Sequence, residues 1–309
     1  MTTAGSGPAH APEFDRWPEA RRRVLGLLDT PAPLLVVADF DGTLAPITRD
    51  PLATRILPAG RRALRLLAHL AAEHPERLRL AVLSGRAALD VAGRVRVGRI
   101  EYLGNHGLEG GRLPARTRAE KLIVEVDPSL ERHVQPAALL GRAVAERLGE
   151  PDWLFVEVKG PSVAFHFRQA SDPDEAVARV DAAIAAVGAA GEAASQGFGE
   201  LERFEGRRVI EFRPRGAGGK GAALRRLIER ERPGTVLVLG DDRSDAEAFR
   251  VLAEERTRGR LDGLAIAVHG AVETPPEVVE AADLLLPSPR EAAAVLNALA
   301  RAASVRLTA

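Results

Sequence analysis

The sequence predicts an α/β fold, in which a parallel β-sheet core flanked by helices is interrupted by an inserted α+β block. Three observations predict it. Apolar segments of strand length alternate with amphipathic segments of helix length up to about residue 110, which is typical of parallel α/β sheets. Near residue 112 the segments change to strands in which apolar and polar residues alternate. The first pattern then returns toward the end of the chain. The length of 309 residues suits two domains, or one domain with a large insertion.

The first part of the chain shows the parallel-sheet pattern most clearly. Its strands are short runs of Leu, Val and Ala, and its helices carry apolar residues three or four positions apart. Pro58 and Pro75 bound the longest of these helices, because proline fits the first turn of a helix and cannot continue one. The expected elements are a helix at 16–28, a strand at 34–39, a helix at 58–75, a strand at 78–86, a helix at 86–95 and a strand at 99–110.

The inserted block and the return of the core follow. The block is expected to contain strands at 121–127, 153–160, 162–169 and 208–214 and helices at 136–148 and 174–190. The core resumes with a helix at 218–230, a strand at 235–242, a helix at 245–255, a strand at 263–268 and a last helix from 289. We therefore predict a disordered tail at 1–13, a core made of 14–114 and 216–309, and an α+β domain at 115–215.

The composition excludes several classes of function. Lys and Arg together number 43, as do Asp and Glu, so no net charge attracts nucleic acid or an anionic membrane. The absence of cysteine excludes disulfides, cysteine-zinc sites and thiol nucleophiles. No secretory signal is recognisable at the N-terminus, and no run of about 18 apolar residues suits a membrane span. We expect a cytoplasmic protein with a small-molecule partner, and a monomer is favoured although the sequence does not determine the oligomeric state.

Two carboxylates end the first apolar strand. Asp39 and Asp41 directly follow the run 34-LLVVA-38 and point to the same side of the strand, about 6–7 Å apart. The carboxyl ends of parallel strands border the crevice where α/β sheets bind ligands. Two carboxylates this close repel each other unless a cation or a proton lies between them, and oxygen ligands favour Mg²⁺. The structural alternative is an Asp-Gly turn with no further role.

A second acidic cluster ends a later strand. In 236-VLVLGDDRSDAEAF-249 the carboxylates are those of Asp241, Asp242 and Asp245. Taken alone, this motif could be a turn and a helix cap, with Ser244 or Asp245 as the N-cap. Because both acidic strand ends of an α/β fold face one crevice, however, the two motifs together favour a metal site.

Two further residues suit a phosphate group. Ser84 follows the second strand near the start of a helix, and Lys220 opens a helix among glycines. Each has a simpler interpretation, Ser84 as an N-cap and Lys220 as an exposed side chain. The segment around Lys220 does not match a nucleotide-binding Walker A loop, because Pro214 stands in place of the first glycine and Gly221 in place of the Ser or Thr. The set predicts phosphoryl transfer, with Asp39 as the nucleophile and Asp41 as the proton donor and acceptor.

These motifs resemble the haloacid dehalogenase-like (HAD) phosphatase superfamily. The resemblance rests on DFDGT at 39–43, Ser84, Lys220 and GDDRSD at 240–245. It implies a Rossmann-like parallel-sheet core with an inserted α+β cap of the C2 type. Within the superfamily the chain most resembles the trehalose-6-phosphate phosphatase family, through DFDGTLAPI, SGR at 84–86, GNHGLE at 104–109, EVKGPSVAFHFRQA at 157–170 and EFRPRGAGGKGAAL at 211–224.

The resemblance implies roles for particular residues. It implies Mg²⁺-dependent hydrolysis of trehalose 6-phosphate to trehalose and inorganic phosphate through an aspartyl-phosphate at Asp39. The implied metal-binding residues are Asp39, Asp41 through its carbonyl, Asp241, Asp242 and Asp245. The implied phosphate-binding residues are Ser84, Gly85 and Lys220, and the implied substrate-binding residues are Arg86, His106, Glu157, Lys159 and His166. The structural alternative for Glu157, Lys159 and His166 is an ordinary solvated sheet face. For His106 the alternative is a turn after a strand.

Several functions stay open at this point. A related glycosyl or pseudo-disaccharide phosphate could be the substrate, since Ser244 and Ala246 depart from the family pattern of Thr and Glu. A sugar phosphomutase would use the same aspartyl-phosphate. A non-catalytic partner domain is disfavoured, because Asp39, Asp41 and Lys220 are all present.

Overall fold

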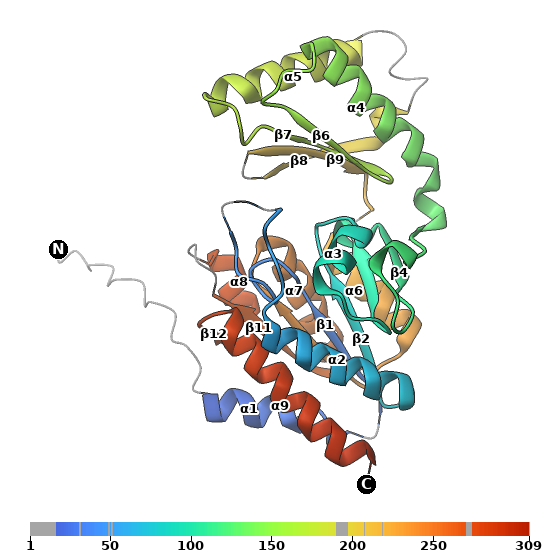
Figure 1. Cartoon of the computed structure of the whole chain (residues 1–309), viewed down its shortest axis with the longest axis vertical. Coiled ribbons are helices and arrows are strands. Elements are labelled where there is room, and N and C mark those ends of the chain that lie inside the picture. The colour runs from blue at the N-terminus through green and yellow to red at the C-terminus, as the bar shows by residue number, and fades with distance from the viewer. Residues whose placement is uncertain are drawn as a thin grey trace, which may run out of the picture.

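The chain forms two units, each built on its own β-sheet (Figure 1). The computed structural model describes residues 17–30, 32–48, 50, 52–189, 197–206, 208–217, 219–269 and 274–308. The tail predicted at 1–13 lies outside these residues. No helix within the described ranges is long and apolar enough to cross a membrane.

The larger sheet contains eight strands in the order β12-β11-β10-β1-β2-β3-β4-β5. The strands are β1 (Leu34–Ala38), β2 (Leu78–Leu83), β3 (Glu101–Gly104), β4 (Glu109–Arg112), β5 (Glu125–Val126), β10 (Thr235–Gly240), β11 (Asp262–Val268) and β12 (Leu284–Leu286). From β12 to β3 all neighbours are parallel, whereas β4 and β5 run antiparallel to their neighbours. The α/β core predicted from the sequence is therefore confirmed, and β1 lies in its centre beside β10.

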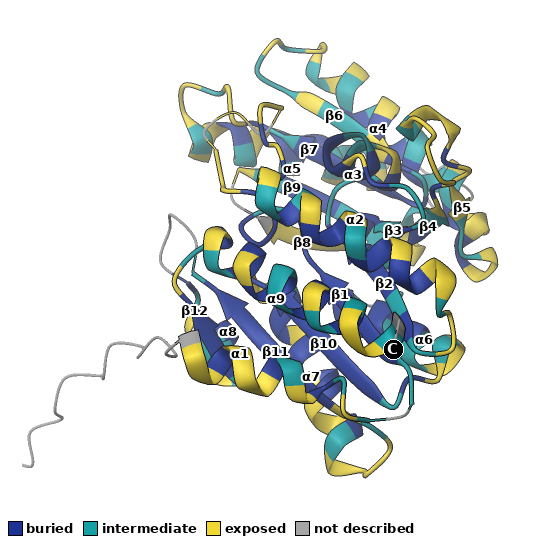
Figure 2. Ribbon diagram, turned by 60° about the horizontal axis from the view of Figure 1, so that its bottom comes forward, coloured by how far each residue is buried: buried dark blue, intermediate teal, exposed yellow. Residues whose placement is uncertain are grey.

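Helices cover both faces of the larger sheet. One face packs against α1 (Trp17–Gly26), α2 (Pro58–Glu73), α3 (Ala88–Val95) and α9 (Pro289–Thr308), and the other against α6 (Lys220–Glu231), α7 (Arg243–Thr257) and α8 (Pro276–Ala281). Alternate residues of β1 enter the two apolar layers, Val36 the first and Val37 the second. Burial on both faces explains why the central strands read as continuous apolar runs, and Figure 2 shows these strands as buried throughout.

The smaller sheet contains four antiparallel strands in the order β6-β7-β9-β8. They are β6 (Phe155–Lys159), β7 (Ser162–His166), β8 (Leu201–Gly206) and β9 (Val209–Pro214). The helices α4 (Val134–Leu148) and α5 (Pro173–Ala189) cover the face turned away from the larger unit (Figure 1). The other face of this sheet is turned toward the larger unit, so the α+β insertion lies over the core.

Two expected segments differ in the structure. The segment 121–127 was predicted as a strand of the inserted block, but its only strand, β5, pairs with β4 in the larger sheet. The segment 99–110 was predicted as one strand, but it divides into β3 and β4 at a 3₁₀ turn, Asn105–Gly107. The predicted domain limits at 114/115 and 215/216 stay predictions.

Candidate active site

The end of β1 places Asp39 at the carboxyl edge of the larger sheet. The backbone N–H of Asp39 donates to the carbonyl of Leu239 at 2.9 Å, which continues the pairing of β1 with β10. The chain then turns at Gly42, whose φ is 77° and whose N–H donates to the carbonyl of Ala45. A Cβ at Gly42 would overlap the carboxylate of Asp241. Glycine is therefore needed here for the left-handed backbone and for the close approach of Asp241.

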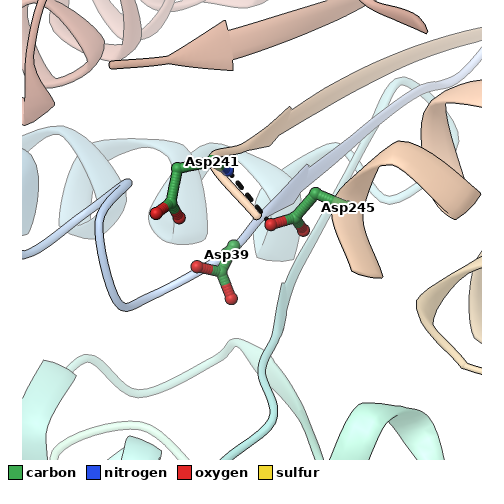
Figure 3. A group of neighbouring side chains, drawn as sticks. All are labelled: Asp39, Asp241 and Asp245. Atoms are coloured by element: carbon green, nitrogen blue, oxygen red, sulfur yellow. Dashed lines mark hydrogen bonds between the residues drawn. The ribbon is translucent and has the colours of Figure 1, made fainter. Parts of the chain in front are cut away.

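Three carboxylates meet beside this turn, those of Asp39, Asp241 and Asp245 (Figure 3). Asp241 directly follows β10, and Asp245 lies in the first turn of α7. Each residue offers an oxygen that lies within 4.8 Å of the other two. The Thr43 hydroxyl donates to Asp241 at 3.2 Å, and the backbone N–H of Asp241 donates to Asp245 at 3.1 Å. The two acidic motifs of the sequence therefore converge on one place.

Lys220 is the buried cation among these carboxylates. Its ammonium group donates to Asp39 at 2.7 Å and to Asp245 at 2.8 Å. Burial raises the pKa of Asp39, Asp241 and Asp245 well above the usual value, and the charge of Lys220 opposes this only in part. Burial lowers the pKa of Lys220, but the surrounding carboxylates outweigh it and raise that pKa. Among the described residues, three buried carboxylates thus face one ammonium, an arrangement that favours a further cation.

Asp41 forms a separate ion pair with Arg86. The Arg86 guanidinium donates to the two carboxylate oxygens of Asp41 at 2.6 and 2.8 Å, and to Asp90 at 3.2 Å. It also lies 5.7 Å from the centre of the Phe40 ring. The Arg86 backbone N–H donates to the Ser84 hydroxyl at 3.1 Å. The structure therefore brings Arg86 to Asp41, and a contact of Arg86 with substrate stays a prediction.

Ser84, Gly85 and His106 lie together at the ends of β2 and β3. Ser84 is buried, and its N–H donates to the carbonyl of Leu103, while its own carbonyl accepts from the N–H of His106. A Cβ on Gly85 would come within 2.8 Å of the His106 ring, so the ring lies directly against the backbone of Gly85. Burial, helped by the charge of Arg213, lowers the pKa of His106 to about 3. The imidazole is therefore neutral near pH 7.

A charged cluster lies on the uncovered face of the smaller sheet. Strand register places its members on one face, opposite the apolar residues that contact α4 and α5; they are Glu157, Lys159, His166, Glu211 and Arg213. His166 and Glu157 lie 2.9 Å apart, and Lys159 and Glu211 also lie 2.9 Å apart. The His166 hydrogen bond lowers the pKa of Glu157. Burial raises the pKa of Glu211, but Lys159 and Arg213 outweigh it and lower that pKa to about 2.

Asn105 joins this face to the larger unit. Its side-chain N–H donates to the carbonyl of Lys159 at 2.6 Å, and its side-chain oxygen accepts from the Ser162 hydroxyl at 2.8 Å. The ammonium of Lys159 also reaches the carbonyl of Gly85, at 3.5 Å. These contacts bring the predicted substrate residue Lys159 next to the predicted phosphate residue Gly85.

Asp242 has a structural role in addition to the one predicted for it. It is the N-cap of α7: its carboxylate accepts from the N–H of Asp245 at 3.0 Å and from the Ser244 hydroxyl at 2.6 Å. The motif does cap a helix, but the expected N-cap, Ser244 or Asp245, was wrong, because the N-cap is Asp242. Asp245, at the third helical position, completes the capping box and also reaches the buried cluster. A metal contact of Asp242 stays a prediction.

Sequence reasoning did not single out three residues of this site as candidates, namely Glu211, Arg213 and Asn105. A signal existed for the first two, because they alternate along one strand, nine and seven residues before Lys220, and so share a face. Asn105 carried no such signal, since its contacts depend on how the β6–β7 turn meets the 3₁₀ turn.

Comparisons with known proteins show which family this sequence resembles. The sequence model of the Trehalose-phosphatase family matches residues 37–275. A curated relative, the trehalose-phosphate phosphatase of Mycobacterium marinum, is 35% identical over 285 residues, which cover 89% of this chain and 66% of the relative. The first relatives that the chain matches are 34% identical over 241 residues, and the chain spans only 16% of their length.

Solved structures share the fold. The C-terminal domain of the Candida albicans trehalose-6-phosphate phosphatase gives a TM-score of 0.66 at 21% identity, covering 96% of this chain and 99% of that one. A haloacid dehalogenase-like hydrolase from Bacteroides thetaiotaomicron gives a TM-score of 0.54 at 16% identity, covering 89% and 99%. The predicted HAD-like architecture is thereby confirmed. Since the family match extends over residues 37–275, well over half of the sequence, the chain belongs to the trehalose-phosphatase family.

Proposed function

We propose that this chain is a Mg²⁺-dependent phosphatase that hydrolyses trehalose 6-phosphate to trehalose and inorganic phosphate. The observation that carries the proposal is the buried group of Asp39, Asp241, Asp245 and Lys220 at the carboxyl ends of two adjacent parallel strands. Family membership and the Mycobacterium relatives named trehalose-phosphate phosphatase support the substrate.

The residues present fit a magnesium ion. The donors are carboxylate oxygens, which hard divalent ions prefer, and Gly42 leaves the space that the Asp241 carboxylate occupies. The ion would be held by the carboxylates of Asp39 and Asp241 and the carbonyl of Asp41, with Asp242 and Asp245 nearby. When bound, it would supply positive charge that neutralises the phosphate and the nucleophile.

Asp39 acts as the nucleophile in the first half of the reaction. One carboxylate oxygen attacks phosphorus, the bond from phosphorus to the sugar oxygen breaks, and an aspartyl-phosphate forms. Lys220 lies 2.7 Å from this carboxylate, so its charge reduces the repulsion between the nucleophile and the dianionic phosphate. Ser84 and the backbone at Gly85 bind the phosphate oxygens.

Asp41 transfers the protons. It donates a proton to the departing sugar oxygen, and then accepts one from the water that attacks the aspartyl-phosphate. This second attack breaks the bond from phosphorus to the Asp39 oxygen and releases inorganic phosphate. Arg86 holds both oxygens of Asp41, and so fixes the direction from which the proton arrives.

The uncovered face of the smaller sheet recognises the sugar. Glu157, Lys159 and His166 offer charged donors and acceptors to hydroxyl groups, and Lys159 and Glu211 are almost fully buried, which a solvated sheet face would not require. His106 lies against Gly85 and reads the sugar nearer the phosphate. A site built to bind hydroxyls discriminates against analogues that lack them.

Phosphate release is the decisive measurement. We expect release from trehalose 6-phosphate in the presence of Mg²⁺, little release from glucose 6-phosphate, and none with a chelator or in the Asp39→Asn variant. Equal catalytic efficiency on both sugars would contradict sugar recognition by the smaller sheet. If an aryl phosphate were hydrolysed but neither sugar phosphate were, the proposed phosphatase reaction would stand and the proposed substrate would be wrong. Full activity of Asp39→Asn would overturn the mechanism.

A further inference from the structure

A cavity opens away from the proposed active site. It has a volume of about 680 Å³, and no residue proposed above to act on trehalose 6-phosphate lines it. It lies at the amino end of β2. There β2 is paired with β1 from Leu78 onward, but its pairing with β3 on the other side begins only at Ala81. Asp39 follows the carboxyl end of β1, and β1 and β2 are parallel. The cavity therefore lies at the opposite edge of the larger sheet from Asp39.

Positive charge dominates the lining of this cavity, which we name the arginine cavity. Three arginines, Arg79, Arg99 and Arg112, line it together with Glu231 and with apolar residues that include Leu80 and Leu113. Its volume lies within the range of small-molecule sites in proteins. Its lining combines apolar surface with a few charged groups, as such sites do.

The one acidic side chain in the lining is already neutralised. Glu231 accepts from Arg79 at 2.9 Å and from Arg230 at 2.8 Å. Within the described residues, Arg99 and Arg112 have no carboxylate at ion-pair distance: Arg99 lies 3.1 Å from the His69 ring, and Arg112 donates weakly to a backbone carbonyl at 3.4 Å. The arginine cavity thus has a surplus of cationic donors.

Arg79 adds an unsatisfied donor. Its Nη1 is buried and finds no hydrogen-bond acceptor among the described residues, although its Nε is paired with Glu231. Buried guanidinium N–H groups normally have acceptors, because an unmade bond to a charged donor costs free energy. Because Nη1 itself has almost no accessible surface, an anion in the cavity would contact the rest of the Arg79 side chain, which is 27% exposed.

We propose that the arginine cavity is a binding site for a small organic dianion with an apolar part, separate from the phosphatase site. The planar forks of arginine match the paired oxygens of phosphate and carboxylate groups, and Leu80 and Leu113 would contact the apolar part. Phosphate monoesters and dicarboxylates share this chemistry, and experiment distinguishes them.

Two non-hydrolysable probes test the proposal on the full chain: phenylphosphonate for the phosphate class and phthalate for the dicarboxylates. Isothermal titration in the presence of a chelator measures their binding without a divalent ion at the phosphatase site. We expect saturable binding of at least one probe. Arg112→Glu should weaken it by about tenfold or more, the loss expected for one charge-assisted hydrogen bond. Arg112 is exposed, so this substitution leaves the fold and the phosphatase activity intact.

Control variants locate the binding. Arg301→Gln changes an exposed arginine on α9 outside the cavity and should bind the probes like wild type. Arg79→Gln should weaken binding as Arg112→Glu does, whereas Ser84→Ala, at the proposed phosphate site, should not. Binding that is unaffected by Arg112→Glu, or lost in Ser84→Ala, would place the probe elsewhere. The absence of saturable binding by both probes would also overturn the proposal.

Discussion

The Arg86 guanidinium donates to both oxygens of Asp41, at 2.6 and 2.8 Å, so a planar fork holds the proposed proton donor. A lysine ammonium is a point donor and cannot fix both oxygens. We expect Arg86→Lys to lower kcat by about 10²-fold, the loss typical of a slightly misplaced group, with KM nearly unchanged. Steady-state kinetics with trehalose 6-phosphate measure both constants.

Arg61→Lys provides the matched control for Arg86→Lys. Arg61 donates to the backbone carbonyls of Arg94 and Val95, away from Asp41, so its replacement should change neither constant. If Arg86→Lys raised KM and left kcat intact, Arg86 would be a substrate-binding residue, as the family resemblance implies.

His106 makes the stability of the protein depend on pH. Burial, followed by the charge of Arg213, lowers its pKa from 6.5 to about 3, so the folded state keeps the ring neutral while the unfolded chain protonates it below about pH 6.5. The contribution of the neutral His106 ring to the free energy of unfolding is complete above pH 6.5 and is lost as the pH falls toward 3. Between pH 7 and pH 5 the loss amounts to about 2 kcal/mol of unfolding free energy.

His106→Asn tests this contribution by urea unfolding at the two pH values. Asparagine tolerates the left-handed backbone, for which φ is 57°, and does not titrate. We expect the variant to lose less stability than wild type between pH 7 and pH 5. Equal losses in the two proteins would show that His106 titrates normally in the folded state.

At the level of single residues, the sequence predicted which side chains converge but not all of their partners. Asp39, Asp241 and Lys220 could be placed together because each stands at an element end on the same edge of a parallel sheet. The pairing of Arg86 with Asp41 depends on a side-chain rotamer, which spacing along the chain does not determine.

A buried hydrogen bond between Asn105 and Ser162 connects the turn between β6 and β7 to the larger unit. Asn105 accepts from the Ser162 hydroxyl at 2.8 Å, and both residues are fully buried. We expect a coupling free energy of about 1 kcal/mol between these positions in a double-mutant cycle of Ser162→Ala and Asn105→Gly. Glycine is chosen because φ of Asn105 is 51°. Urea unfolding of the four proteins gives the coupling.

A second cycle controls this measurement. The hydroxyl of Thr117 bonds within its own exposed loop, so Thr117→Ala and Ser162→Ala should be additive. Additivity of the Asn105 and Ser162 substitutions as well would mean that the observed hydrogen bond does not fasten the two units.

Elements were predicted well where burial gives a periodic pattern. The central strands and the long helices follow from apolar runs and helical spacing. The error at 99–110 arose because the backbone leaves the extended region directly after Gly104. The φ values of Asn105, His106 and Gly107 are 51°, 57° and 88°, so β3 ends there. The two-residue β5 pairs through a contact distant in sequence, which no local pattern reveals.

For the whole molecule, the sequence predicted two units but not how they meet. Parallel and antiparallel sheets differ in their apolar pattern, so the insertion could be recognised. Among the described residues, the junction includes contacts of Asn105 with Lys159 and Ser162 and of Lys159 with Gly85. Such contacts leave no periodic trace in the sequence, and they bring the proposed sugar-binding face next to the proposed phosphate site.

Metal binding should control the stability of this assembly. Without a divalent ion, the carboxylates of Asp39, Asp241 and Asp245 are opposed by Lys220, and burial with mutual repulsion raises the pKa of Asp241. Asp241→Asn removes one of these charges, so in a chelator we expect the variant to be at least as stable as wild type. Mg²⁺ at about 100 times its Kd should then stabilise wild type by about 2.7 kcal/mol, and Asp241→Asn much less.

Asp242→Asn is the control that decides which acids hold the ion. Asparagine caps a helix about as well as aspartate, so α7 should keep its first turn. If only the three converging carboxylates contact the metal, this variant keeps the full Mg²⁺ response in thermal unfolding. Loss of the response in Asp242→Asn would make Asp242 a ligand as well. A wild-type protein whose unfolding temperature does not respond to Mg²⁺ would contradict a metal site at Asp39.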